Sequence, residues 1–377
     1  MKDVRIEELA SNILKHSVKL KEKEDILIEV IGEEGMPLAK ELVRQAEEMK
    51  ARPYFKIINV EILRTMLQNA TEEQIKLYAK HDWNRMKDMD AYIGIRATSN
   101  TSELSGIPDE KMEMYNKNYT FPVHFEERVK NTKWCILRYP NKSMAQMSNM
   151  NTDEFEDFYF NVCNLDYEKM SKAMDRLVSL MNKTDKVQIK GKDTDLTFSI
   201  KDIPAEKYVG TFNLPDGEVA TAPVIDSING YITYNTQTSY NGKTFNNIRF
   251  EFKDGKIIKA TSNNNDENTT KELNKILDID RGARFIGEFA IGLNPYIEKP
   301  IGDTLFDEKI KGSFHLTPGD SLEESDNGNR SSIHWDIVNI QTPEYGGGEI
   351  WFDDVLIRKD GLFVLDELLC LNPENLI

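Results

Sequence analysis

The sequence is poor in the features that mark disulfide-rich, secreted or membrane-spanning proteins. Its three cysteines are scattered, so neither a disulfide framework nor a Cys-x-x-Cys zinc site is available. No apolar run approaches the roughly 18 residues of a membrane span. The charged, amphipathic N-terminus lacks the apolar core of a signal peptide. These absences predict a cytoplasmic protein that has no membrane partner.

Positive charge is also scarce. The chain has 48 Lys and Arg against 64 Asp and Glu, a formal net charge of −16, and an isoelectric point near 5.0. A strongly negative surface repels phosphate backbones, so we expect no nucleic-acid partner. The same field attracts divalent cations and the ammonium end of a peptide, which is compatible with a metal enzyme that acts on amines.

The first half of the chain alternates between extended and helical spacing of its apolar residues. At 377 residues the chain exceeds the usual size of a single core, which favours two domains. Strand patterns alternate with helix patterns, and this alternation predicts a mostly parallel sheet covered by helices. The expected strands are 25–31, 53–60, 91–97 and 134–140, and the expected helices are 37–50, 72–80, 152–163 and 167–182.

The pattern changes near residue 184. From Lys186 onward the chain consists of short strand patterns separated by Gly and Asn turns, and Asp254-Gly255 and Asp360-Gly361 each predict a tight hairpin. We therefore predict the α/β class. Residues 1–184 would form an N-terminal α/β domain with a mostly parallel sheet, and residues 185–377 a β-rich α+β C-terminal domain.

Candidate metal ligands gather in the C-terminal half. His334 and Asp336 are two residues apart in SSIHWDIV, so on a strand both side chains point to one face and Trp335 to the other. Imidazole together with carboxylate suits Zn²⁺, Co²⁺ or Mn²⁺. The pair is therefore a candidate chelate for one of these ions.

Three further donors accompany this pair. Glu218 follows the turn-like Pro215-Asp216-Gly217, Glu288 follows Gly287, and His315 stands before Pro318-Gly319, where we expect a loop or a strand end. Carboxylates can bridge two metal ions, which then activate a water for hydrolysis. Spacing alone leaves open whether each residue is a ligand or an ordinary structural or surface side chain.

Several segments together resemble the M29 family of metallo-aminopeptidases, the aminopeptidase T and aminopeptidase S group. The resemblance extends over most of the chain and rests on the order and spacing of its segments, among them RYPNKSMAQMSNMNTDEFEDFYFNVCNLDY, GKDTDLTFSI, FNLPDGEVATAPV, GEFAIGLNP and SSIHWDIV. It implies a dimeric enzyme that removes N-terminal residues from peptides with a free N-terminus. It also implies that two divalent ions, Zn, Co or Mn, lie in the C-terminal domain.

The resemblance also assigns the site. It implies that the metal ligands are Glu218, Glu288, His315, His334 and Asp336, and that Glu218 and Glu288 are catalytic as well. The family's tyrosine, which stabilises the tetrahedral intermediate, would stand at position 322, where this chain has Leu322. Tyr345, in the glycine-rich PEYGGGEI, is a candidate replacement, and Arg330 is another.

Two alternatives follow from these observations. One is a different two-metal hydrolase, such as a phosphoesterase, although cationic residues are scarce around the proposed ligands and phosphate sites usually recruit Arg or Lys. The other is a non-catalytic or weakly active family member that binds metal or peptide, which Leu322 keeps open.

Overall fold

The computed structural model describes residues 3–100, 102–240 and 242–377, and it divides into two compact units. The first comprises Met1–Asn164 and Gly210–Pro215, and the second Leu165–Val209 and Asp216–Ile377. The predicted boundary near residue 184 differs, because helix α9 (Tyr167–Met181) packs with the second unit. Lys207 of strand β7 (Glu206–Tyr208) illustrates this, since its ammonium donates to the Ser171 carbonyl of α9 at 3.0 Å.

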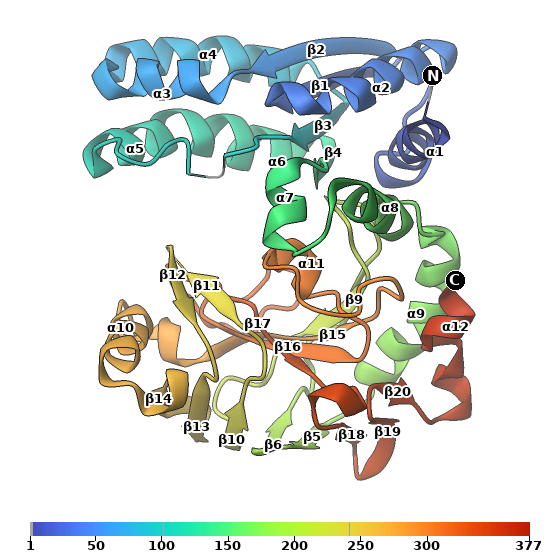
Figure 1. Cartoon of the computed structure of the whole chain (residues 1–377), viewed down its shortest axis with the longest axis vertical. Coiled ribbons are helices and arrows are strands. Elements are labelled where there is room, and N and C mark those ends of the chain that lie inside the picture. Colours follow the sequence, from blue (N-terminus) through green and yellow to red (C-terminus); the bar gives the residue numbers. More distant parts are fainter. Residues whose placement is uncertain (1–2, 101, 241) are drawn as a thin grey trace. The chain divides into compact units, whose positions relative to one another are not determined.

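The first unit contains a five-stranded, fully parallel sheet in the order β2-β1-β3-β4-β8 (Figure 1). This confirms the predicted α/β sheet, whose strands are β1 (Asp25–Ile31), β2 (Arg52–Ile58), β3 (Ala91–Arg96), β4 (Lys133–Arg138) and β8 (Asn213–Leu214). The helices are α1 (Val4–Asn12), α2 (Met36–Glu48), α3 (Val60–Asn69), α4 (Glu72–Lys87), α5 (Asp109–Tyr115), α6 (Val129–Asn131), α7 (Lys142–Met147) and α8 (Thr152–Cys163). The first unit also contains a short π-helix at Ile13–Ser17, a 3-10 turn at Glu33–Gly35 and a longer π-helix at Asn116–Arg128.

The second unit is β-rich, as the sequence predicts, and nearly all of its strand pairs are antiparallel. Its eight-stranded sheet has the order β14 (Lys256–Thr261), β13 (Arg249–Lys253), β10 (Asn229–Thr233), β6 (Thr194–Ser199), β5 (Lys186–Gly191), β18 (Gly348–Phe352), β19 (Val355–Lys359) and β20 (Leu362–Phe363). A two-stranded ribbon joins β11 (Thr238–Tyr240) to β12 (Lys243–Phe245). Both predicted Asp-Gly hairpins are confirmed, with positive φ at Asp254, Gly255, Asp360 and Gly361.

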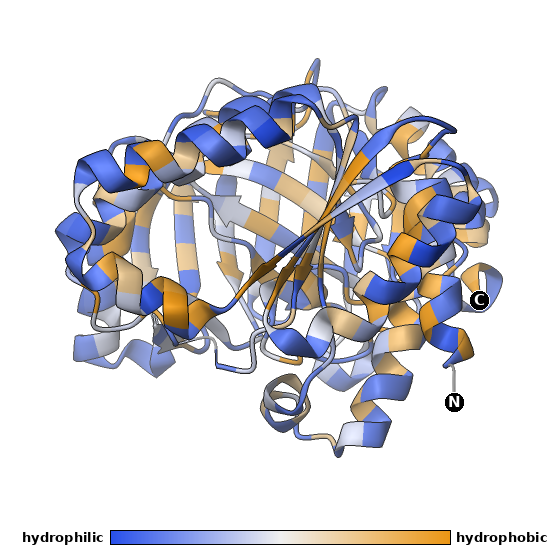
Figure 2. Ribbon diagram, turned by 90° about the horizontal axis from the view of Figure 1, so that it is seen from above, coloured by the Kyte–Doolittle hydropathy of each residue, from blue (hydrophilic) through white to orange (hydrophobic). Residues whose placement is uncertain are grey.

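The sheet that carries the candidate ligands has five strands. Its order is β17 (Ile337–Ile340), β16 (Ser313–Pro318), β15 (Ile286–Gly292), β9 (Glu218–Thr221) and β7 (Glu206–Tyr208). Its three central strands are buried along their whole length, which explains their continuous apolar runs between the polar ligands. In the hydropathy-coloured ribbon, long stretches of strand are hydrophobic, whereas the helices alternate between hydrophilic and hydrophobic residues (Figure 2).

The remaining helices of the second unit are short apart from α9 and α10. They are α10 (Glu267–Leu277), α11 (Thr304–Asp307) and α12 (Pro373–Leu376), with 3-10 turns at Asn263–Asn265, Gly282–Arg284, Pro343–Tyr345 and Asp366–Leu371. Within the described ranges, every helix falls short of the length and apolarity needed to cross a membrane.

A buried ionic network supports the first unit and gives a test of its stability. The ammonium of Lys56 donates to Glu29 at 2.9 Å, to Asp82 at 2.8 Å and to the Tyr119 hydroxyl at 3.1 Å. Its side chain is only 11% exposed. Removing it would leave two carboxylates without their cation in a low-dielectric interior.

We expect Lys56→Met to lower the free energy of unfolding by about 3–5 kcal/mol, because one partner of a buried ion pair is lost. Urea titration followed by circular dichroism measures this difference. Lys130→Met is the matched control, since Lys130 pairs with Glu126 in the same unit but is 57% exposed. That control should change stability by no more than about 1 kcal/mol. Equal effects of the two substitutions would contradict the interpretation.

Candidate metal centre

Strand register brings four of the five candidate ligands to one face of the five-stranded sheet. Glu218 lies opposite Gly292, His315 opposite Ala290, and Glu288 opposite Thr317. These pairs fall in neighbouring rows of the same face, because side chains directly opposite each other in an antiparallel pair point the same way. Continuing the pairing of β16 with β17 by one step puts Asp336 opposite Thr317, whose hydroxyl donates to the Asp336 carboxylate at 2.7 Å.

The two glutamates occupy the positions that the sequence predicts. Glu218 is the first residue of β9 and follows Gly217, whose φ of +128° is accessible mainly to glycine. Glu288 lies in β15 just after a register shift between Ile286 and Glu288, which marks a local irregularity of the pairing. A turn and an irregular pairing therefore direct the two carboxylates.

His315 differs from its prediction. It is expected in a loop or at a strand end, but it lies in the middle of β16 and its side chain is 1% exposed. The strand continues for three residues after His315 and ends at Pro318, whereas a loop position would require it to end before His315. The imidazole is consequently held between two neighbouring strands, which makes its position more rigid than a loop would.

His334 and Asp336 share a side, as predicted, and Trp335 points away from them. The Trp335 indole donates to Thr238 and packs on Tyr240 and Phe245 of the ribbon. Strand β17 begins only at Ile337, so the pair lies in an extended segment bridged to Gly319 rather than in the strand itself. The His334 Nδ1 lies 2.9 Å from the Asp320 carbonyl oxygen, which leaves Nε2 facing the other ligands.

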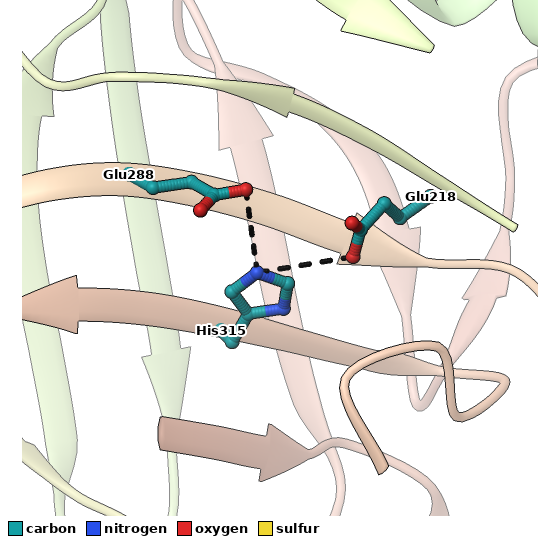
Figure 3. Close-up of side chains that lie close together, drawn as sticks. All are labelled: Glu218, Glu288 and His315. Atoms are coloured by element: carbon teal, nitrogen blue, oxygen red, sulfur yellow. Dashed lines mark ion pairs between the residues drawn. The ribbon is translucent and has the colours of Figure 1, made fainter. Parts of the chain in front are cut away.

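The five side chains form two triplets that share Glu288. In the first, Glu218, Glu288 and His315 offer ligand atoms within 4.8 Å of one another, and in the second Glu288, His334 and Asp336 do the same. Figure 3 shows the first triplet, in which His315 Nε2 lies 3.6 Å from Glu288 and 3.8 Å from Glu218. In the second, His334 Nε2 lies 3.1 Å from Glu288 and 3.3 Å from Asp336.

Burial and mutual charge set the protonation of these groups. Burial would lower the pKa of both imidazoles, but hydrogen bonds to the carboxylates raise it to about 9 for His315 and to about 12 for His334. Burial raises the pKa of Glu218 to about 7, against the opposing effect of the Lys309 ammonium. Asp336 is also buried, yet its hydrogen bond and ion pair with His334 hold its pKa below the ordinary value.

The residues fit a divalent metal. The Glu218 Oε2 atom is buried without a hydrogen-bond partner among the described residues, and it lies 3.8 Å from His315 Nε2. Most buried polar atoms are paired, so an unpaired carboxylate oxygen beside other ligand atoms fits a bound cation. The mixed imidazole and carboxylate set suits Zn²⁺, Co²⁺ or Mn²⁺.

Sequence reasoning missed the residues that surround these donors. Lys309 contacts Glu218 although it is 91 positions away, and no local pattern announces that contact. Three small residues lie beside the ligands on the same face of the sheet, and their size leaves space for the ligand side chains. They are Ala220, Ala290 and Gly292. A Cβ added at Gly292 would lie 2.5 Å from Ser313 Oγ and 2.6 Å from the Ile310 carbonyl oxygen, so only glycine fits.

Tyr345 and Arg330, the two candidates for the role of the missing tyrosine, have charged neighbours other than the five candidate ligands. Tyr345 lies in a 3-10 turn, and the charges that act on its phenol are those of Asp307 and Glu344. Arg330 is 61% exposed and pairs with Asp326. Tyr208, by contrast, lies directly opposite Glu218 on the ligand face.

Known proteins are similar to this chain over most of its length. The family described as thermophilic metalloproteases (M29) matches residues 2–349. Aminopeptidase PepS of Streptococcus thermophilus is 24% identical over 314 residues, which are 71% of this chain and 74% of that protein. Aminopeptidase 2 of Geobacillus stearothermophilus is 22% identical over 329 residues, 76% of each chain.

Solved structures share the fold. Wild-type AmpT from Thermus thermophilus superposes with a TM-score of 0.78 at 19% identity, over 96% of this chain and 99% of that chain. The 2,5-dihydroxypyridine dioxygenase of Pseudomonas putida KT2440 superposes with a TM-score of 0.61 at 14% identity, over 96% and 98%. Because this second neighbour bears the name of an oxygenase, the fold by itself does not determine the reaction.

Metal binding should release protons from this site. Without metal, His315 and His334 have pKa values raised to about 9 and about 12, so both imidazoles are protonated at pH 7. A ligating imidazole must be neutral and a ligating carboxylate ionised, so at pH 7 we expect roughly two protons to leave from the imidazoles and about half a proton from Glu218, and above pH 9 roughly one proton in all. Calorimetric titration with Zn²⁺ in buffers of different ionisation enthalpy measures the number. A binding enthalpy independent of the buffer would contradict the assignment of the two histidines.

Proposed function

The chain belongs to the M29 family of metalloproteases, and on that premise we propose that it is a metal-dependent aminopeptidase that hydrolyses the N-terminal residue of peptides. The observation that carries the proposal is the pair of ligand triplets sharing Glu288. Two divalent ions would be held by such a pair, one by each triplet, and Glu288 would contribute to both. When bound, the ions supply a water of lowered pKa and a Lewis acid for the scissile carbonyl.

The protein's own side chains hold and orient this centre. His334 is fixed through its Nδ1 by the Asp320 carbonyl, and Asp336 is fixed by the Thr317 hydroxyl. Hydrogen bonds of this kind to the far side of a ligand set its orientation and its basicity. They are built into backbone and strand neighbours, so the ligand geometry is determined before metal or substrate arrives.

The site is more open at one end than at the other. The His334 side chain is 31% exposed and that of Asp336 16%, whereas those of Glu218 and His315 are 7% and 1% exposed. A peptide would therefore meet the triplet of His334 and Asp336 first. The surrounding carboxylates favour the positively charged end of a substrate, which agrees with peptides that have a free N-terminus.

The expected activity is tested with metal-replete protein and chromogenic anilides of leucine or arginine. Amine release should occur from the free amino acid derivative and be lost when its amino group is acetylated. Glu288→Gln should reduce kcat by at least roughly 100-fold, because it removes the carboxylate shared by both triplets. Glu298→Gln is the control, since Glu298 is 69% exposed and pairs with Lys311.

Two results would overturn the proposal. Protein that binds metal and leaves every unblocked peptide intact would favour a member that binds without cleaving. Cleavage of blocked and free substrates at equal rates would favour another kind of two-metal hydrolase. Wild-type turnover in Glu288→Gln would refute the site rather than the activity.

The family's tyrosine, which would stabilise the tetrahedral intermediate, is replaced by Leu322 in this chain. We assign its role to Tyr208 and not to Tyr345. Tyr208 lies opposite Glu218, and burial followed by the charges of Glu288 and Glu324 raises the pKa of its phenol. The hydroxyl therefore stays protonated and able to donate to a developing oxyanion. No such arrangement surrounds Tyr345, whose charged neighbours are Asp307 and Glu344.

We expect Tyr208→Phe to lower kcat by roughly 10²–10³ with little change in KM, because a donor to the transition state is lost. Tyr345→Phe should stay near wild type and serves as the matched control. Steady-state kinetics on leucine anilide separates the two constants. A large loss in Tyr345→Phe with none in Tyr208→Phe would return the role to Tyr345.

A further inference from the structure

A buried lysine contacts one of the two triplets. Lys309 follows the short helix α11 and its side chain is 4% exposed. Its ammonium lies 2.7 Å from Glu218 Oε1 and 3.9 Å from Asp216 Oδ1, and it also pairs with Glu308. Lysine is almost never buried to this extent without partners, and here three carboxylates surround it.

The backbone holds this lysine in place. The Lys309 carbonyl accepts from the Asn294 amide at 3.0 Å, and the Lys309 amide donates to the Phe306 carbonyl at 3.0 Å. The next residue, Ile310, forms a bridge with Asn294, which follows strand β15. The ammonium is therefore a fixed charge of the site and not a mobile surface group.

Lys309 limits the number of Glu218 oxygen atoms that can bind a metal ion. One carboxylate oxygen of Glu218 accepts the ammonium, and the other, Oε2, is buried without a hydrogen-bond partner and faces His315 Nε2 at 3.8 Å. Glu218 can thus give a single oxygen to a metal, and its negative charge is shared with a cation. Glu218 and Glu308 each accept a hydrogen bond from the ammonium, and Asp216 adds a longer ion pair at 3.9 Å, so Lys309 is held against these carboxylates and positions Glu218.

The second triplet lacks such a neighbour. Within the part of the chain that the structure describes, the ion-pair partners of His334 are Glu288 and Asp336, and no lysine or arginine pairs with these three residues. Both oxygens of Glu288 face imidazoles, Oε1 at 3.6 Å from His315 and Oε2 at 3.1 Å from His334. One triplet therefore has a lysine ammonium in direct contact with one of its ligands, and the other does not.

We propose that Lys309 makes the two metal positions unequal, so that the ion held by Glu288, His334 and Asp336 binds tightly and the ion held by Glu218, Glu288 and His315 binds weakly. The ammonium shares the charge of Glu218 and repels a divalent cation at short range through a medium of low dielectric constant. The inference rests on the two-metal site of the proposed function. Its consequence is that the chain holds one ion when metal is scarce and two when metal is abundant.

The test is a titration of chelator-treated protein with Co²⁺, followed by calorimetry and by the visible absorption of the bound ion. In the wild type we expect one tight event and a second that is at least roughly tenfold weaker. Lys309→Met should tighten the second event by at least roughly tenfold and leave the first little changed. Lys311→Met is the matched control on the same segment, since Lys311 pairs with exposed Glu298, and it should titrate as the wild type does.

A double variant guards against misfolding. Lys309→Met alone removes the ammonium from Glu218, Glu308 and Asp216, which is destabilising for buried carboxylates. The variant with Glu308→Gln and Lys309→Met together removes one charge of each sign, and it should show the same tightening of the second event. Lys309→Arg retains the cation and should retain the difference between the two events.

Three outcomes would overturn the inference: two events of equal affinity in the wild type, an unchanged second event in both variants that lack the lysine, or a weakened one. These results are separate from the proposed activity, because they need no peptide. Protein with unequal metal affinities and no peptidase activity would refute the function alone. Active protein with two equal affinities would refute the role of Lys309 alone.

Discussion

Mutual repulsion among buried carboxylates is the constraint on which the second unit depends. Glu218 and Glu288 from two strands and Asp336 from the segment before β17 converge on one face of a sheet, where ionised groups lose most of their hydration. Removing such charges from water costs several kcal/mol per ion unless they are paired. His315, His334 and Lys309 supply the compensating charge in the protein itself. Divalent metal would replace the protons of the imidazoles but would leave the lysine in place.

The sheet makes this concentration of charge sterically possible. On strand β15 the residues opposite the ligands are small, with Gly292 beside Glu218 and Ala290 beside His315. Larger side chains there would fill the space between the donors and bring apolar surface against ionised groups. Gly292 also allows the segment around Lys309 to approach, since a Cβ at this position would lie 2.9 Å from the Glu308 carbonyl oxygen and 2.6 Å from that of Ile310. Gly292 therefore leaves space both for the ligands and for the segment that contains Lys309.

Much of the fold and of the ligand set could be predicted from the sequence, because both depend on local patterns. Alternation of strands and helices indicates the parallel sheet, and the two-residue period of His334 and Asp336 gives their common side correctly. The predicted loop position of His315 is wrong, because Pro318-Gly319 indicates a turn but does not show where the preceding strand begins. The contacts of Lys309 and the position of Tyr208 depend on cross-strand register and on the path of a loop, neither of which has a local signature.

Exposure and charge vary together across the site, and this affects how the protein tolerates loss of metal. The end with His334 is the more exposed, so its charges can be compensated by water when metal is absent. The end with Glu218 is buried, and there water cannot perform that role. A permanent ammonium at the buried end compensates the carboxylate whatever the metal supply, which avoids an unpaired charge in the sheet. The lysine that weakens one metal position is therefore also the group that keeps the metal-free site compatible with the folded chain.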